Sequence, residues 1–116
     1  MASAQRYFIT IDDLAHARGD SSALSFNGDA PETLASVLQA ALREPGLWER
    51  WRAEQDEPDE VDPLTGATDT SATVSGALSD LRTELKIVTT LSHAIVKHRL
   101  DLLVGRHWKL RDVSAG

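Results

Sequence analysis

The segment His93–Val113, HAIVKHRLDLLVGRHWKLRDV, gathers the side chains best suited to chemistry. It holds three of the chain's four histidines and five basic residues, in a protein whose formal net charge is −6. Histidine binds metal ions, while arginine and lysine bind phosphate and other anions. We therefore consider three interpretations: a metal site, an anion or nucleic-acid site, and a helix and strand with structural roles only.

The spacing of the histidines argues against a metal site. On a helix, His93 and His98 differ in direction by about 140°, whereas zinc ligands on one helix are three or four residues apart. His107 follows Gly105 and belongs to another element, and His16 is distant in the sequence. The chain also has no cysteine to supply a thiolate. We therefore expect no metal and no cofactor.

Arg99 has an unusual position in the helix predicted after Ser92. At about 100° per residue, it falls near the centre of an apolar arc that comprises Ile95, Val96, Leu100, Leu102 and Leu103. A guanidinium there must reach the edge of the core or pair with a carboxylate. A structural ion pair, with Glu84 or with the acidic segment, is the leading interpretation. The other is an anion ligand at the mouth of a pocket.

The basic residues of the C-terminal third define the second candidate function. The residues proposed to bind an anion or nucleic acid are Arg99, Arg106, Lys109 and Arg111. Trp108 would be available to stack on a base. However, nucleic-acid-binding domains are as a rule basic, and in an alternating strand Trp108 shares its face with Leu110, which indicates a core position. Nucleic-acid binding is therefore the alternative and not the leading prediction.

Two tryptophans provide the strongest sign of protein binding. Trp48 and Trp51 lie three residues apart on one side of a short predicted helix, together with Leu47. This is a large apolar area beside a charged loop, and tryptophan is enriched at interface hot spots. They are structural if the core covers both, and an interface anchor if one is exposed. The leading prediction is a non-catalytic protein-interaction or regulatory module that binds another protein or itself through Trp48 and Trp51.

No motif identifies a catalytic group. Asp12 and Asp13 follow a predicted strand, but adjacent strand residues point to opposite faces. Residues 18–21 spell RGDS, a tetrapeptide that resembles the integrin-recognition motif, and we interpret it as a tight turn. We therefore name no catalytic residue, and a small enzyme is the third hypothesis.

The sequence pattern predicts strands and helices around these residues that together form an α+β domain. Strands are expected at 6–11, 23–26, 80–91 and 107–113, and helices at 29–44, 45–55 and 92–104. The resulting order, β-β-α-α-β-α-β, predicts a two-layer domain in which helices cover one face of a four-stranded sheet.

Residues 74–91 have a second interpretation. A strand places alternate residues from Leu81 to Leu91 on one face. A helix would align another apolar stripe, but it would have to accommodate Gly76 and the β-branched segment 87–90. The alternation favours the strand, and a helix-rich fold with 74–104 helical is the alternative.

Length and charge predict a single domain with a long loop. The chain has 116 residues, of which 41% are hydrophobic, enough for a core without disulfides. Residues 53–80 carry eight acidic and no basic side chains, whereas 81–116 carry seven basic and three acidic ones. We expect one domain over 1–116, with an acidic Pro/Gly/Thr-rich loop at about 56–76 that balances the basic third or binds an opposite charge.

Hydropathy predicts no contact with membranes. No apolar run approaches the roughly 20 residues that span a bilayer. The N-terminal segment also lacks the apolar core of a signal peptide. We therefore expect a cytoplasmic protein.

Overall fold

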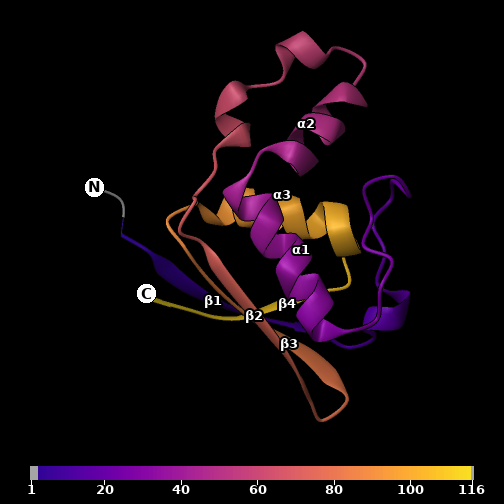
Figure 1. Cartoon of the computed structure of the whole chain (residues 1–116), viewed down its shortest axis with the longest axis vertical. Coiled ribbons are helices and arrows are strands. Elements are labelled where there is room, and N and C mark those ends of the chain that lie inside the picture. Colours follow the sequence, from indigo (N-terminus) through magenta and orange to yellow (C-terminus); the bar gives the residue numbers. More distant parts are fainter. Residues whose placement is uncertain (1–2, 116) are drawn as a thin grey trace.

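The computed structural model describes residues 3–115, which contain one four-stranded antiparallel sheet (Figure 1). The strands are β1 (Gln5–Ile11), β2 (Thr73–Ser79), β3 (Arg82–Thr89) and β4 (Lys109–Ala115). The α-helices are α1 (Pro31–Arg43), α2 (Gly46–Ala53) and α3 (His93–Val104). The strand order in the sheet is β2-β3-β1-β4. Apart from the short α2, the chain order β-α-β-β-α-β is the ferredoxin-like arrangement.

The two central strands bury one face of the sheet. In β1 the buried side chains alternate with partly exposed ones, and in β3 they alternate mostly with exposed ones. The register places Tyr7 beside Ile87 and Ile9 beside Leu85, so their side chains form a continuous apolar face. The predicted strand at 6–11 is confirmed, and the one at 80–91 is confirmed over 82–89.

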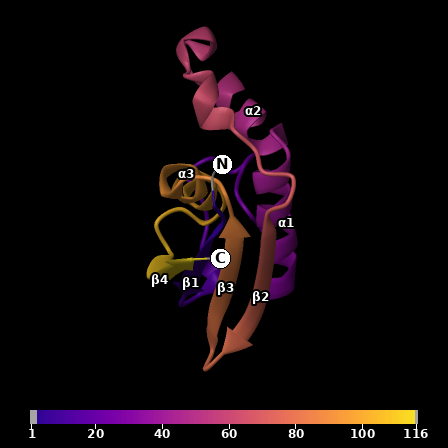
Figure 2. The same ribbon diagram turned by 90° about the vertical axis from the view of Figure 1, so that its left-hand side faces the viewer.

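Helices α1 and α3 complete the core against this face. Leu34, Leu38 and Leu42 of α1 join the same buried cluster as Leu100 and Leu103 of α3. Figure 2 shows α1 alongside β2, while α2 and the loop after it extend beyond the end of the sheet. The predicted α+β fold, with a four-stranded sheet and helices, is therefore confirmed.

The ends of the two long helices follow local rules. Ser92 Oγ accepts a hydrogen bond from the Ile95 amide and caps α3, and Gly105 ends α3 at a φ of 66°, as predicted. Helix α1 differs slightly, because its N-cap is Ala30, without a side-chain cap, and not Asp29. A proline in the first turn favours the start of this helix, because it has no amide hydrogen to satisfy.

A β-hairpin replaces the single strand predicted from residue 80. Strands β2 and β3 are joined at Asp80 and Leu81, whose φ angles are 49° and 67°. A Cβ at Gly76 would lie 2.5 Å from the Pro31 carbonyl oxygen, so glycine lets α1 cross the strand closely. The alternative with 74–104 helical is wrong, because the main chain of 73–79 pairs with β3.

The strand predicted at 23–26 is wrong. This segment is an irregular loop in which Leu24 and Phe26 are buried. The Phe26 amide donates to the Leu103 carbonyl oxygen at 2.9 Å. The alternation of residues 23–26 thus reflects two apolar side chains that pack against α3, without a strand partner.

The acidic loop after α2 is shorter than predicted, since β2 begins at Thr73. It contains two 3-10 turns, Pro58–Glu60 and Pro63–Gly66. Arginine side chains tie it to the helices, because Arg52 Nε donates to the Pro58 carbonyl oxygen at 2.8 Å and Arg43 Nε to that of Ala72 at 2.6 Å.

Asp69 fixes the end of this loop and provides a test. Its carboxylate accepts hydrogen bonds from the Thr90 amide (3.0 Å), Thr89 Oγ1 (2.8 Å) and the Ser71 amide (3.0 Å). The Thr90 bond is the largest cause that lowers the pKa of Asp69 below its usual value near 3.8. Asp69→Asn replaces an acceptor with an N–H donor, and we expect a loss of about 1 kcal/mol at pH 7.

The pH dependence follows from the sign of this shift. A lowered folded-state pKa stabilises the fold above the unfolded-state value, and the gain is lost as pH falls through the folded-state value. Urea unfolding from pH 7 to pH 3 should therefore bring the wild type and Asp69→Asn together. Asp56→Asn, in the same loop, is the control and should match the wild type throughout. An equal loss at both ends of the range would contradict the assignment.

Candidate functional site

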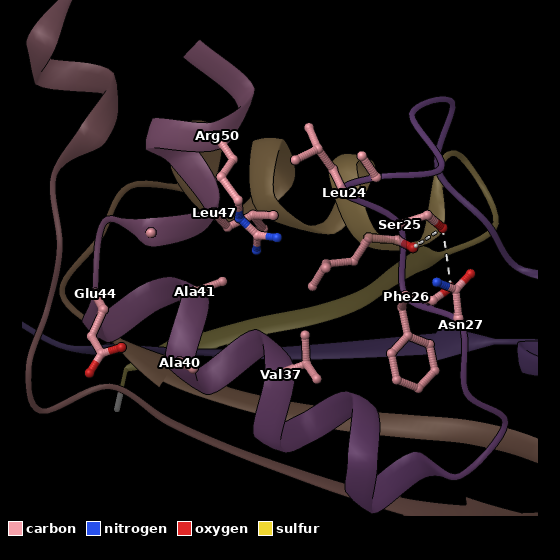
Figure 3. Close-up of a pocket in the computed structure, with 13 residues that line it drawn as sticks. Leu24, Ser25, Phe26, Asn27, Val37, Ala40, Ala41, Glu44, Leu47 and Arg50 are labelled. Carbon is pink, nitrogen blue, oxygen red and sulfur yellow. Dashed lines mark hydrogen bonds between the residues drawn. The ribbon is translucent and has the colours of Figure 1, made fainter. Parts of the chain in front are cut away.

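A groove with an apolar floor lies between α1, α2 and the loop 23–27 (Figure 3). We call it the α1–α2 groove. Its volume of about 400 Å³ is in the range of ligand sites. Exposed Val37, at 38% exposure, lies on its α1 wall. The buried side chains that line it are Leu24, Phe26, Ala41, Leu47 and Leu103.

Arg50 is the cationic group of this groove. It lies on α2, and its guanidinium points into the recess between Leu47 and Leu24 (Figure 3). Within residues 3–115 no carboxylate forms an ion pair with it. Glu44 also lines the groove, but its carboxylate lies at the far edge (Figure 3). An unpaired guanidinium next to an apolar floor suits a ligand that carries a carboxylate.

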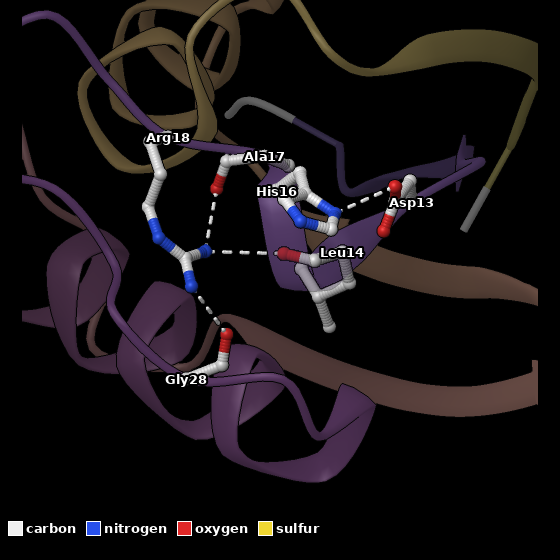
Figure 4. Close-up of polar contacts among 6 residues, drawn as sticks. All are labelled: Asp13, Leu14, His16, Ala17, Arg18 and Gly28. Atoms are coloured by element: carbon white, nitrogen blue, oxygen red, sulfur yellow. Dashed lines mark hydrogen bonds and ion pairs between the residues drawn. The ribbon is translucent and has the colours of Figure 1, made fainter.

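Local sequence explains both walls of the groove. Pro45 disfavours helical geometry at Glu44, so α1 stops and α2 starts in a new direction. The opposite wall is held by Arg18, which donates to the carbonyl oxygens of Leu14 (3.1 Å), Ala17 (2.8 Å) and Gly28 (3.1 Å) (Figure 4). The arginine of the RGDS tetrapeptide therefore holds the loop in place.

Three of the residues predicted to bind a partner lie together on the other side of α2, around the turn 63–66. Trp48 is only 7% exposed, and its Nε1 donates to Thr65 Oγ1 at 3.0 Å. Arg99 Nη2 donates to the Thr65 carbonyl oxygen at 2.7 Å. Trp51 is partly buried and packs edge-on against His98, with ring centroids 4.4 Å apart. Trp48 and Arg99 thus hold the acidic loop against the helices, while Trp51 packs against α3 and the core.

Arg99 is a buried cation without a carboxylate. It is 1% exposed, and within residues 3–115 it forms no ion pair, whether with Glu84 or with the acidic segment. The acidic segment contributes a carbonyl oxygen, that of Thr65, and no charge. Burial lowers the pKa of Arg99 to about 10, so the side chain is charged at neutral pH.

His98 is the immediate neighbour of this cation. Arg99 Nη1 contacts His98 Nδ1, and since a guanidinium only donates, Nδ1 must be unprotonated. Burial, and next the charge of Arg99, lower the pKa of His98. The ring is therefore neutral at pH 7.

The other predicted basic residues lie at a different place. Arg106 and Lys109 line a polar cleft of about 330 Å³ between the end of β1 and the start of β4. Arg111 is exposed beside it, and its Nε donates to Thr10 Oγ1 at 2.9 Å. The structure thus brings Arg106, Lys109 and Arg111 together but separates them from Arg99.

Sequence reasoning missed the residues of the α1–α2 groove. Arg50 carried no pattern of its own, and residues 23–26 were assigned to a strand. Val37 belongs to an apolar helical stripe that is otherwise buried. Its exposure depends on the direction in which α2 turns away from α1, which the sequence does not give. The usable signal was the Glu44-Pro45-Gly46 break, which separates two short amphipathic helices.

Within the described part of the chain, no group of three or more histidine, aspartate or glutamate residues could hold a metal ion. Each helix there is too short or too polar to cross a bilayer. Comparison of the chain with protein-family models, curated proteins and solved structures finds no match in any of the three.

His98 predicts a measurable pH dependence of stability. Its pKa is lower in the folded state than its usual value of 6.5, so the unfolded chain takes up a proton first as pH falls. This contribution to stability is complete above about pH 6.5 and is lost as pH falls below that value. His98→Gln keeps an acceptor for Arg99 without titrating, and it should flatten the slope between pH 7.5 and 5.5.

Urea midpoints at pH 7.5, 6.5 and 5.5 measure this slope. His107→Gln changes an exposed ring and serves as the matched control with an unaltered slope. A slope that survives in His98→Gln would show that another group causes it.

Proposed function

We propose that this chain is a non-catalytic binding module, whose α1–α2 groove takes an apolar side chain of a partner protein with a neighbouring carboxylate. The observation that carries the proposal is Arg50, which points unpaired into a groove floored by buried leucines. The apolar floor would take the side chain, and the guanidinium would orient the partner by pairing with its carboxylate.

The groove is better suited to binding than to catalysis. Its hydroxyl group, that of Ser25, is already engaged with main chain, since it accepts from the Gly19 amide at 2.9 Å and lies 3.2 Å from the Leu103 carbonyl oxygen. The titratable side chains that line it are Arg50 and Glu44. A nucleophile with an adjacent base, which covalent catalysis requires, is not part of this set.

The proposed partner is still a protein, as the sequence predicts, but the proposed binding face is the α1–α2 groove and not the face that carries Trp48 and Trp51. Trp48 faces the acidic loop and Trp51 packs against His98 of α3, whereas Leu47 and Arg50, on the same helix, line the groove. A second copy of the chain is the other candidate occupant. The cytoplasmic location stays a prediction from the sequence.

Random-peptide display on the folded protein tests this proposal. Selected peptides should share a large apolar residue flanked by aspartate or glutamate, and they should bind in the micromolar range typical of such small contacts, about −8 kcal/mol. Val37→Asp and Arg50→Glu should each weaken binding at least about tenfold, or about 1.4 kcal/mol.

Matched controls make equal changes away from the groove. Leu78 is exposed on β2 and Arg82 on β3, so Leu78→Asp and Arg82→Glu should leave peptide binding unaltered. Failure to select any apolar–acidic sequence, or equal losses in the control variants, would refute the proposal. A concentration-dependent dimer that Val37→Asp abolishes would identify a second copy as the occupant.

A further inference from the structure

The polar cleft lined by Arg106 and Lys109 has a composition unlike the α1–α2 groove. Two histidines, His16 and His107, also line it, as do Asp12 and Asp13. Its walls come from the two ends of the chain, since β1 and the 3-10 turn Leu14–His16 face the turn after α3 and the start of β4. We call it the β1–β4 cleft.

Both carboxylates of the cleft are engaged with neighbouring side chains. Asp13 Oδ2 lies 2.8 Å from His16 Nδ1. Asp12 lies between two cations, with Oδ1 3.4 Å from Arg82 Nε and Oδ2 3.7 Å from Lys109 Nζ. The charge of Asp12 is therefore offset by these two cations, and Asp13 is engaged as a hydrogen-bond acceptor of His16.

The remaining groups are donors for an anion. Arg106 and His107 are exposed, and within residues 3–115 neither side chain makes an ion pair or a side-chain hydrogen bond with another residue. Because a carboxylate only accepts, the Nδ1 of His16 carries the hydrogen in its pair with Asp13. His16 Nε2 can then accept the proton of a P–OH group, or donate to a phosphoryl oxygen once the ring is protonated.

Trp108 adds an aromatic wall to the cleft. Its Nε1 donates to Asp101 Oδ1 at 2.9 Å, which holds the partly buried indole in place. A fixed aromatic ring beside a phosphate site stacks on a planar base at little entropic cost. The chemistry of this cleft thus combines an anion site with an apolar surface.

We infer that the β1–β4 cleft binds a phosphomonoester. Arg106, His107 and His16 contact the phosphate, and Trp108 packs against the organic group. A bidentate guanidinium bond to phosphate is the strongest of these interactions. This site is separate from the α1–α2 groove and does not depend on the function proposed there.

The test titrates the ¹⁵N-labelled full chain at pH 7 and low salt with three phosphates. These probes are inorganic phosphate, ribose 5-phosphate and adenosine monophosphate, with adenosine as the phosphate-free control. Saturable shifts are expected at the Arg106 and His107 amides for all three phosphates. If the organic group is a nucleoside, adenosine monophosphate should cause the largest shift of the Trp108 indole signal. If it is a sugar, ribose 5-phosphate should cause an equally large shift.

Variants distinguish specific binding in the cleft from nonspecific electrostatic attraction of phosphate to the protein. Arg106→Ala should weaken each phosphate about tenfold, as expected for the loss of a charge-assisted bond, and His16→Gln should weaken it by a smaller factor. Lys86→Ala removes an equal charge from an exposed position on β3 outside the cleft lining, so its affinity should stay within about twofold of the wild type. Trp108→Phe should bind inorganic phosphate with the affinity of the wild type.

Three results would overturn the inference. The first is the absence of saturation by any phosphate at tens of millimolar. The second is an equal loss in Arg106→Ala and Lys86→Ala, which would show attraction without a site. The third is binding of adenosine as tight as that of its monophosphate, which would leave the phosphate without a role.

Discussion

The burial of one face of the sheet is the constraint on which the rest of this structure depends. Tyr7, Ile9, Leu85 and Ile87 present a continuous apolar surface, and α1 and α3 must lie across it to exclude water. Once they do, α2 has little of that face left to cover, so it extends beyond the sheet with the acidic loop (Figure 2). The recess between α1 and α2 is a direct result of that direction.

Arginine side chains stabilise the long loops around this small sheet. Arg18, Arg43, Arg52 and Arg99 each donate to main-chain carbonyl oxygens of segments without regular partners. A buried or half-buried carbonyl needs such a donor, and a guanidinium supplies several at once. Much of the basic character that would suggest ligand binding is therefore used inside the fold. Arg50 lines the α1–α2 groove and Arg106 the β1–β4 cleft, and neither donates to a main-chain carbonyl oxygen within residues 3–115.

The two recesses have complementary chemistry and share no lining residue. The α1–α2 groove has an apolar floor with one cation, which suits a protein side chain beside a carboxylate. The β1–β4 cleft has paired carboxylates, two histidines and an aromatic wall, which suits a small phosphate. Helix α3 links them, since Leu103 lines the groove while Gly105, directly after the helix, directs Arg106 toward the cleft.

The sequence by itself determined the elements whose signals are local. Alternation identified β1 and most of β3, and a serine cap and a left-handed glycine bounded α3, because these depend on neighbouring residues and on one buried face. The α+β class followed from them. Only the tertiary structure decided that 73–79 pairs as a strand while 23–26 does not, since strand pairing depends on a distant partner and both segments are short. It also decided that Arg99 bonds a carbonyl oxygen and that Arg50 faces a groove. The partner of a charged side chain depends on which groups the tertiary structure brings near it. The position of the residue along a helix does not specify that partner.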